Sequence, residues 1–245
     1  GLDFISTPFD FEAADFLESL NVPAFKIASL EITDIPLIEH IARKNKPIII
    51  STGVADEEDI KLAVDTCKRA GNDQLALLKC TSAYPTPPEE MNVRAIKTLF
   101  DIFHTTVGLS DHSLGIEIPV LSIAFGAKII EKHFILDKKN SKSVDKDFSL
   151  DKNEFTQMVK AVRNAEKALG NGSLELTSKM KSAKQSVRSL FITKDIKKGE
   201  SLTVENLKSI RPGNGLHPKY YYEVLGKKVN RDVDAGTPFS LELFK

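Results

Sequence analysis

Two histidines end neighbouring apolar runs of this sequence. His112 follows VGLSD, and His133 follows AKIIEK, 21 residues further along the chain. A short apolar run is typical of a strand buried in a parallel sheet, so polar side chains at its end face either water or a ligand. Two imidazoles on neighbouring strands suit a divalent first-row metal, and oxygen ligands at the remaining positions favour Mn²⁺ or a similar ion. The pattern predicts a metal site at His112 and His133, although a strand-end histidine is often only a hydrogen-bonded structural residue.

Hydroxyl, amine and carboxylate side chains also lie at the ends of the apolar runs. In chain order these residues are Thr7, Lys26, Ser29, Glu31, Ser51, Ser82, Tyr84 and Ser110. Hydroxyls, backbone amides and a lysine at one edge of a sheet form an anion site suited to phosphate or carboxylate. Glu31 is then the candidate for proton transfer. The alternatives are structural, because serines also cap helix N-termini and Lys26 could extend along apolar surface toward water.

Six apolar runs must position these side chains. They are Leu2–Ser6, Ala24–Ala28, Pro47–Ser51, Leu75–Cys80, Thr105–Leu109 and Lys128–His133. Between them, apolar residues recur at steps of three and four, which predicts helices over 11–20, 36–44, 56–70, 92–100 and 116–125. Strand–helix alternation of this kind predicts a parallel sheet with right-handed crossovers.

The polar strand ends favour a particular α/β fold. In a (β/α)₈ TIM barrel the residues at the carboxyl ends of the strands build the active site. An open doubly wound sheet is the alternative, but no glycine-rich dinucleotide loop follows any of the runs. The chain begins at Gly1 without a methionine, and Leu2–Ser6 already has the pattern of a core strand. We therefore expect a barrel that lacks its first two βα units in this chain.

The pattern changes toward the C-terminus. A helix expected from Lys152 to Leu169 closes the barrel domain, residues 1–170, and a polar linker covers 171–187. In residues 188–245, DIKKGESLT at 195–203 and DVDAGTPFS at 232–240 share one spacing of aspartate, glycine, apolar and hydroxyl residues. This near-repeat predicts a small β-rich domain with two similar turns, each with a glycine at positive φ.

Composition excludes several classes of protein. The chain has 245 residues, of which 41% are hydrophobic, and its 34 basic and 34 acidic residues cancel. No overall field therefore favours nucleic acid or an anionic membrane. No apolar run approaches the length of a membrane span, and no signal-peptide pattern is present. Two cysteines, Cys67 and Cys80, make no disulfide framework, so we expect a cytoplasmic protein.

Ten motifs, in this order, resemble those of the sialic acid synthase family. They are STPFD, KIASLE, ISTG, CTSAYPTP, GLSDHS and EKHF, followed by RSLF, DIKKGE, RPGNGLHPK and GTP. The last four resemble the family's antifreeze-like (SAF) domain, and the resemblance covers nearly the whole chain. It implies a TIM barrel, a C-terminal SAF domain of the β-clip type, and an enzyme. That enzyme joins phosphoenolpyruvate to an amino sugar in a metal-dependent aldol-type condensation.

The resemblance also implies roles for single residues. It places the divalent metal on His112 and His133, as Mn²⁺ first, with Mg²⁺ or Co²⁺ as alternatives. Glu31 matches the acidic residue beside the reacting carbon, so Glu31 and Lys26 are the implied catalytic residues. Ser82 replaces an asparagine of the family and reaches less far. The implied contacts of phosphoenolpyruvate are Thr7, Lys26, Ser29, Ser51, Ser82 and Ser110.

The remaining implied roles concern the sugar and a second subunit. Tyr84, Asp145 and Arg211 match sugar-binding positions of the family. Arg211 would reach the active site of the neighbouring subunit, which implies a domain-swapped homodimer. In the family, the first two barrel strands supply a further acid and a lysine, which have no counterpart here. We therefore expect the chain alone to have weak activity or none.

The family has several substrate branches. KIASLE, EKHFIL and GLHPKYYYEVLG resemble the pseudaminic acid branch, whose sugar is 2,4-diacetamido-2,4,6-trideoxy-L-altrose, whereas neuraminate synthases typically read KIGSGE and RHFT. N-acetylneuraminate and legionaminic acid synthesis remain alternatives. A related barrel that makes deoxy-sugar acids or deoxyheptulosonate phosphate would need a second phosphate site, for which the sequence has no basic cluster. A non-catalytic carbohydrate-binding protein is disfavoured by the intact His112, His133, Lys26 and Glu31.

Overall fold

The computed structural model describes residues 1–139 and 141–244. The chain divides into two compact units, Gly1–Asn171 and Gly172–Lys245. Each unit has its own apolar core. Within the described residues, no helix is both long enough and apolar enough to cross a membrane.

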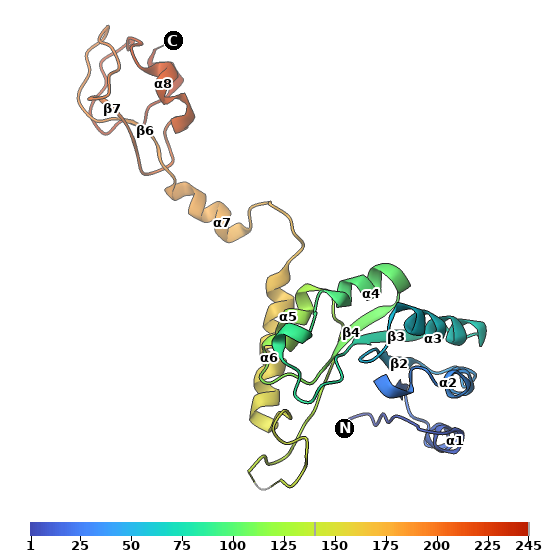
Figure 1. The fold of residues 1–245 in the computed structure, drawn as a ribbon. Coiled ribbons are helices and arrows are strands. Elements are labelled where there is room, and N and C mark those ends of the chain that lie inside the picture. The colour runs from blue at the N-terminus through green and yellow to red at the C-terminus, as the bar shows by residue number, and fades with distance from the viewer. Residues whose placement is uncertain (140, 245) are drawn as a thin grey trace. The chain divides into compact units, whose positions relative to one another are not determined.

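The first unit is built on a parallel five-stranded sheet in the order β1-β2-β3-β4-β5 (Figure 1). Each strand pairs with the next in the chain, and the sheet curls like part of a barrel wall. The strands are β1 (Phe25–Ile27), β2 (Ile48–Ser51), β3 (Leu75–Lys79), β4 (Thr106–Asp111) and β5 (Ile129–Lys132). The structure thus confirms an α/β fold with a curled parallel sheet. Four of the six predicted runs contain a strand, and a fifth, Thr105–Leu109, covers the first part of β4, which continues to Asp111.

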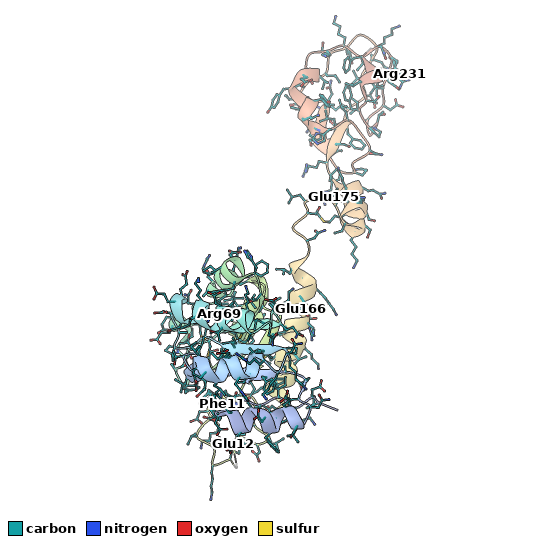
Figure 2. All side chains as sticks on the ribbon, turned by 90° about the vertical axis from the view of Figure 1, so that its right-hand side faces the viewer. Phe11, Glu12, Arg69, Glu166, Glu175 and Arg231 are labelled. Carbon is teal, nitrogen blue, oxygen red and sulfur yellow. The ribbon has the colours of Figure 1, made fainter. Side chains whose placement is uncertain are left out.

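Helices cover the convex face of this sheet. The connecting helices are α1 (Phe11–Ser19), α2 (Ile35–Ala42), α3 (Glu57–Arg69), α4 (Ala95–Phe103) and α5 (Glu117–Ala124), and α6 (Lys152–Leu169) packs on α5. Figure 2 shows α1, marked by Phe11 and Glu12, beside α2. Asp56 and Asp151 form capping boxes that begin α3 and α6, which satisfies backbone amides that a helix cannot pair. The apolar faces of these helices pack on the convex face of the sheet and bury its side chains.

Residues 2–6 do not form the strand that their apolar pattern predicts. Leu2, Phe4 and Ile5 are exposed, and no regular structure is assigned before Phe11. The segment makes one strand-like bond, from the Lys26 amide to the Ser6 carbonyl at 3.4 Å. A strand needs a continued ladder of such bonds, because a single one does not offset the cost of ordering the backbone.

The second unit is a separate small domain, as predicted. It contains β6 (Ser189–Ile192) and β7 (Leu207–Ile210), which pair antiparallel, and the short helix α8 (Tyr221–Val224). The two near-repeats pair with each other, because the amides of Ile196 and Val233 donate to each other's carbonyls at 2.9 Å. Gly199 and Gly236 take φ of 88° and 89°, so both turns have the left-handed glycine that the spacing predicts.

The stretch predicted as a polar linker, 171–187, is not irregular throughout. It contains the helix α7 (Ser178–Ala183) and a 3₁₀ turn at Lys184–Ser186. The Thr177 side chain caps α7 by accepting a hydrogen bond from the Met180 amide at 3.2 Å. A threonine cap of this kind supports a short helix even in a polar sequence.

Candidate active site

The carboxyl ends of the strands bring the polar side chains together on the concave face of the sheet. Side chains alternate between the faces of a strand, so Ile27, Ile50 and Leu109 enter the core beneath the helices. Their neighbours Lys26, Ser51 and Ser110 take the opposite side, where contacts among them and Glu131 join β1, β2, β4 and β5. A cavity of about 260 Å³ lies at this edge and is lined by Ser110–His112 and Glu131–His133.

A larger hollow of about 810 Å³ opens elsewhere. It is lined from the first residues of the strands, such as Ile48, Leu75 and Thr106. This is the amino-terminal end of the sheet, where parallel α/β folds place residues for stability. We assign the chemistry to the carboxyl-terminal edge because the charged and hydroxyl side chains contact one another there.

Lys26 is the buried cation of the concave face. Its Nζ donates to Ser51 Oγ at 2.8 Å and to the Ile27 carbonyl at 3.0 Å. Glu131 Oε2 lies 3.8 Å from Nζ, and Ser110 Oγ donates to Glu131 Oε1 at 2.5 Å. Burial lowers the pKa of Lys26, and the nearby carboxylates of Glu131 and Glu31 oppose that change. The predicted anion-binding lysine is thus held beside two hydroxyls and one partly exposed carboxylate.

Gly53 is packed closely against three polar side chains beside these groups. The Gly53 amide donates to Ser29 Oγ at 2.9 Å, and a Cβ atom at Gly53 would collide with Ser29 Oγ, Ser82 Oγ and Cys80 Sγ. Ser82 Oγ is buried and has no hydrogen-bond partner in the described part of the chain. A buried hydroxyl without a partner is costly, so this atom points to a ligand that would accept or donate a bond there.

The two histidines meet as the sequence predicts. Their ring centroids are 5.2 Å apart. His112 Nδ1 lies 3.0 Å from the Thr81 carbonyl, which accepts the Nδ1 proton and leaves the lone pair on Nε2. Burial favours the neutral ring of His112, but hydrogen bonds with Cys80 and Thr81 outweigh it, so its pKa lies above the ordinary value. Burial and the neighbouring His112 lower the pKa of His133.

Aromatic rings hold this pair of imidazoles. The Tyr84 ring lies 4.3 Å from that of His112, centroid to centroid. Phe148, which is buried, packs edge-on against His133 at 4.9 Å and lies 5.7 Å from Tyr84. The sequence pointed to Tyr84 but not to Phe148, because a single phenylalanine in the polar segment VDKDFSLD gives no signal of its position.

The remaining predicted residues are less fully placed by contacts. Asp145 lies close to the histidines, with Oδ2 at 3.6 Å from His133 Nδ1. Glu31 follows β1 in a 3₁₀ turn, and its charge acts on the pKa of Lys26. Thr7 is half-buried in the segment before α1. Arg211 belongs to the second unit, where it is exposed and follows β7.

Asp111 and Lys132 form an ion pair at the same edge of the sheet, which the sequence did not predict. Lys132 Nζ lies 2.7 Å from Asp111 Oδ2, and neither side chain has any exposed surface. They lie on the face opposite the histidines. Asp111 is the last residue of the run VGLSD before His112, but the sequence pattern does not predict the strand register that brings it to Lys132.

Metal-binding chemistry depends on which donors the chain supplies. Within residues 1–139 and 141–244, no set of three or more His, Cys, Asp and Glu side chains is placed to hold an ion. Two neighbouring imidazoles are present, one with its proton fixed on Nδ1, and the Asp145 carboxylate lies beside the other. Nitrogen donors with a hydrogen-bonded second ring nitrogen fit a divalent first-row ion.

The family to which the chain belongs follows from its match to known proteins. The NeuB family model matches residues 1–174, and the SAF domain model matches residues 187–245. The chain belongs to the NeuB family. Pseudaminic acid synthases of Campylobacter jejuni and Helicobacter pylori are 49% and 45% identical to it, over 96% and 98% of this chain and 68% and 71% of theirs. An N,N'-diacetyllegionaminic acid synthase of Legionella pneumophila is 39% identical over 97% of this chain and 68% of its own.

Solved structures agree with this assignment. A spore coat polysaccharide biosynthesis protein of Bacillus subtilis matches all of this chain and 74% of its own, with a TM-score of 0.65 and 35% identity. An N-acetylneuraminic acid synthetase of Leptospira borgpetersenii, solved with citrate, matches 72% of this chain and 61% of its own, with a TM-score of 0.68 and 36% identity. This NeuB-family chain therefore shares fold and sequence with enzymes of sialic acid biosynthesis.

Proposed function

We propose that this NeuB-family protein condenses phosphoenolpyruvate with 2,4-diacetamido-2,4,6-trideoxy-L-altrose to give pseudaminic acid and phosphate. The single observation that carries the proposal is the concave edge of the sheet, where Lys26, the serine hydroxyls and the two histidines lie together. The identity of 45% or more to two pseudaminic acid synthases supports this sugar over its relatives. The motifs KIASLE and EKHFIL support the same branch.

The anion part of the site supports phosphoenolpyruvate as one substrate. Lys26 is buried and already bonded to Ser51, and Ser82 Oγ has no partner in the described part of the chain. A preformed set of one cation, several hydroxyls and the backbone around Gly53 suits a phosphate with a neighbouring carboxylate. Thr7, Ser29 and Ser110 complete the contacts that we assign to this substrate.

The reaction can be derived from these groups. C3 of phosphoenolpyruvate bonds to the aldehyde carbon of the open-chain sugar, water adds at C2, and phosphate leaves by cleavage of its C–O bond. Lys26 and the hydroxyls hold the phosphate and compensate its charge. Glu31 accepts the proton of the attacking water. Tyr84, Asp145 and Arg211 orient the sugar, so positioning supplies a large part of the rate.

The histidines would hold the divalent ion, for which we propose Mn²⁺, with Mg²⁺ or Co²⁺ as substitutes. When bound, such an ion supplies Lewis-acid polarisation of the sugar aldehyde. Phe148 and the Thr81 carbonyl fix the two rings, so His112 and His133 need little reorganisation to bind it. Glu131, between Lys26 and Ser110, opposes the effect of burial on the pKa of Lys26 and orients the serine hydroxyl.

The proposal also covers the complete barrel domain and the assembly of two subunits. We assign the five-stranded sheet of the first unit to the wall of a (β/α)₈ barrel, and the protein to a domain-swapped homodimer in the cytoplasm, with Arg211 in the partner's active site. Charge supports the assembly: residues 1–171 carry 20 Lys and Arg against 26 Asp and Glu, whereas residues 172–245 carry 14 against 8. An acidic unit and a basic unit in one chain are electrostatically complementary between two copies.

Metal and substrate binding test the proposal without depending on fast turnover. We expect the metal-free protein to bind Mn²⁺ in an electron paramagnetic resonance titration, and phosphoenolpyruvate to bind in calorimetry. His112→Ala should abolish Mn²⁺ binding and leave the fold intact. His104→Asn is the matched control, because His104 is outside the site and its φ of 53° is one that asparagine tolerates. Unchanged Mn²⁺ affinity in His112→Ala and in His133→Ala would refute the metal site.

A further inference from the structure

The strands that carry the two histidines are joined by a buried ion pair. Asp111 and Lys132 are partners in the β4–β5 register, each one residue before a histidine. Asp111 Oδ2 and Lys132 Nζ are 2.7 Å apart, and both side chains are completely buried. Because side chains alternate, the pair lies on the face opposite the imidazoles. The ion pair therefore links the two strands at the residues immediately before His112 and His133.

The same contact also holds the chain on the far side of His112. The Ser113 amide and Oγ donate to Asp111 Oδ1 at 2.9 and 2.7 Å, and Lys132 Nζ donates to the Ser113 carbonyl. Residues 111 and 113 are thus both tied to β5, and the backbone of His112 lies between them. The Thr86 amide adds a bond of 3.0 Å to the His112 carbonyl.

The backbone of His133 is held in a comparable way. Lys132 precedes it, and the Leu150 amide donates to the His133 carbonyl at 2.8 Å. Phe148, from the same segment as Leu150, packs on the ring. Both imidazoles consequently lie on backbone that is restrained on each side, and the ion pair is the restraint that the two strands share.

Stability alone does not account for a contact of this kind. Taking two charges out of water costs more than an apolar pair of similar volume, so a buried ion pair is weak evidence of a stability role. Groups behind the ligands of a metal orient them, and their loss typically lowers metal affinity by about 10- to 100-fold. A fixed separation of two imidazoles is what two ligands of one ion require.

We infer that Asp111 and Lys132 are positioning residues that set the separation of His112 and His133 for metal binding. The inference rests on the proposed function, because it concerns the metal of that site. Ser113 bonds to both members of the ion pair, and we call Asp111, Lys132 and Ser113 together the clamp. The side chains of Asp111 and Lys132 are completely buried, so we expect their effect to be on the geometry of the ligands.

Metal affinity of charge-neutral variants tests the inference. The full 245-residue chain is titrated with Mn²⁺ alone, and binding is followed by electron paramagnetic resonance. Asp111→Asn/Lys132→Met removes both charges and keeps an oxygen for Ser113, so the melting temperature should recover relative to Lys132→Met. Mn²⁺ affinity should still fall about tenfold or more. Wild-type affinity in this folded double variant would overturn the inference.

Two further variants keep the result decisive. Ser113→Ala removes only a hydroxyl and should fold, and its Mn²⁺ affinity should be about two- to threefold lower than that of the wild type. Unchanged Mn²⁺ affinity in Ser113→Ala would contradict the role of the clamp, even if the double variant does not fold. Lys97→Met, which breaks the exposed pair with Asp101 on α4, is the control and should bind Mn²⁺ normally. If His112→Ala also binds Mn²⁺ as wild type, the proposed metal site fails, and that result is distinct from failure of the clamp.

Discussion

Two pairs of opposite charge lie at the same edge of the sheet, on opposite faces. Behind the histidines, Asp111 and Lys132 are 2.7 Å apart and wholly buried. On the concave face, Lys26 and Glu131 are 3.8 Å apart, and their side chains are 10% and 45% exposed. The first pair is closed and satisfied by Ser113, whereas the second is loose and open on one side. The closed pair suits a structural restraint, and the open pair leaves charge available for a substrate.

Removing the lysine of each pair should change the stability by very different amounts, and this is the largest effect that we predict. Lys132→Met leaves Asp111 buried and unpaired, so the free energy of unfolding should fall by about 3–5 kcal/mol. Lys26→Met should change stability by about 1 kcal/mol or less, because burial lowers the pKa of Lys26 and its charge is costly in the fold. Urea unfolding measures both variants, and equal destabilisation would contradict the distinction.

Gly53→Ala tests the open side of the site. An added Cβ would lie within 3 Å of Ser29 Oγ, Ser82 Oγ and Cys80 Sγ, so it would displace the two serine hydroxyls that we assign to phosphoenolpyruvate. We expect phosphoenolpyruvate affinity to fall about tenfold, equivalent to about 1.4 kcal/mol, while Mn²⁺ affinity stays unchanged. Calorimetry with each ligand separates the two. Normal phosphoenolpyruvate binding in this variant would exclude Gly53 from the substrate pocket.

The pH dependence of binding should sharpen the role of Lys26. Its pKa is lowered by burial, so Lys26 loses its proton at a lower pH than an exposed lysine does. Affinity for phosphoenolpyruvate should therefore fall on the alkaline side, beginning below the ordinary lysine range of about 10.4. Lys26→Gln should bind weakly at every pH and lose this alkaline limb, whereas Lys61→Gln, at an exposed position on α3, should keep it. An alkaline limb in Lys26→Gln would assign the titration to another group.

The smallest effect is expected for an ion pair outside the site. Lys97 and Asp101 are 2.7 Å apart, but both side chains are more than half exposed on α4. Lys97→Met should lower the free energy of unfolding by about 0.5 kcal/mol or less, because solvent screens such a pair. Urea unfolding at low and high salt checks this value. A loss as large as that in Lys132→Met would show that burial is not what separates the two pairs.

The sequence predicted the concave side of the edge better than the convex side. Polar residues that end apolar runs, such as Lys26, Ser51 and Ser110, are visible in the sequence, and the rule that parallel strands end at one edge brings them together. The histidines were found in the same way. Glu131 lies in the run AKIIEK that His133 ends, yet its place between Lys26 and Ser110 depends on distances that only the curled sheet fixes.

Other features depend on register and tertiary contacts. Asp111 and Lys132 are 21 positions apart, and their pairing follows only once β4 and β5 are aligned. Phe148 reaches the histidines from the segment after β5, where no periodic pattern marks it. Leu2–Ser6 shows the reverse error: its apolar residues resemble a strand, but a single ladder bond does not make one. The sequence pattern predicts which residues lie on each face of a strand, whereas the pairing of the strands determines which of those residues contact one another.

The most direct test of the account is identification of the product. The chain, with Mn²⁺ and phosphoenolpyruvate, would be incubated at high enzyme concentration with the altrose sugar, N-acetylmannosamine or neither, and the reaction analysed by mass spectrometry and phosphate release. We predict that pseudaminic acid and one equivalent of phosphate form slowly with the altrose sugar only, and that neither forms with His112→Ala. A neuraminate product from N-acetylmannosamine alone, or phosphate release that His112→Ala leaves unchanged, would contradict it.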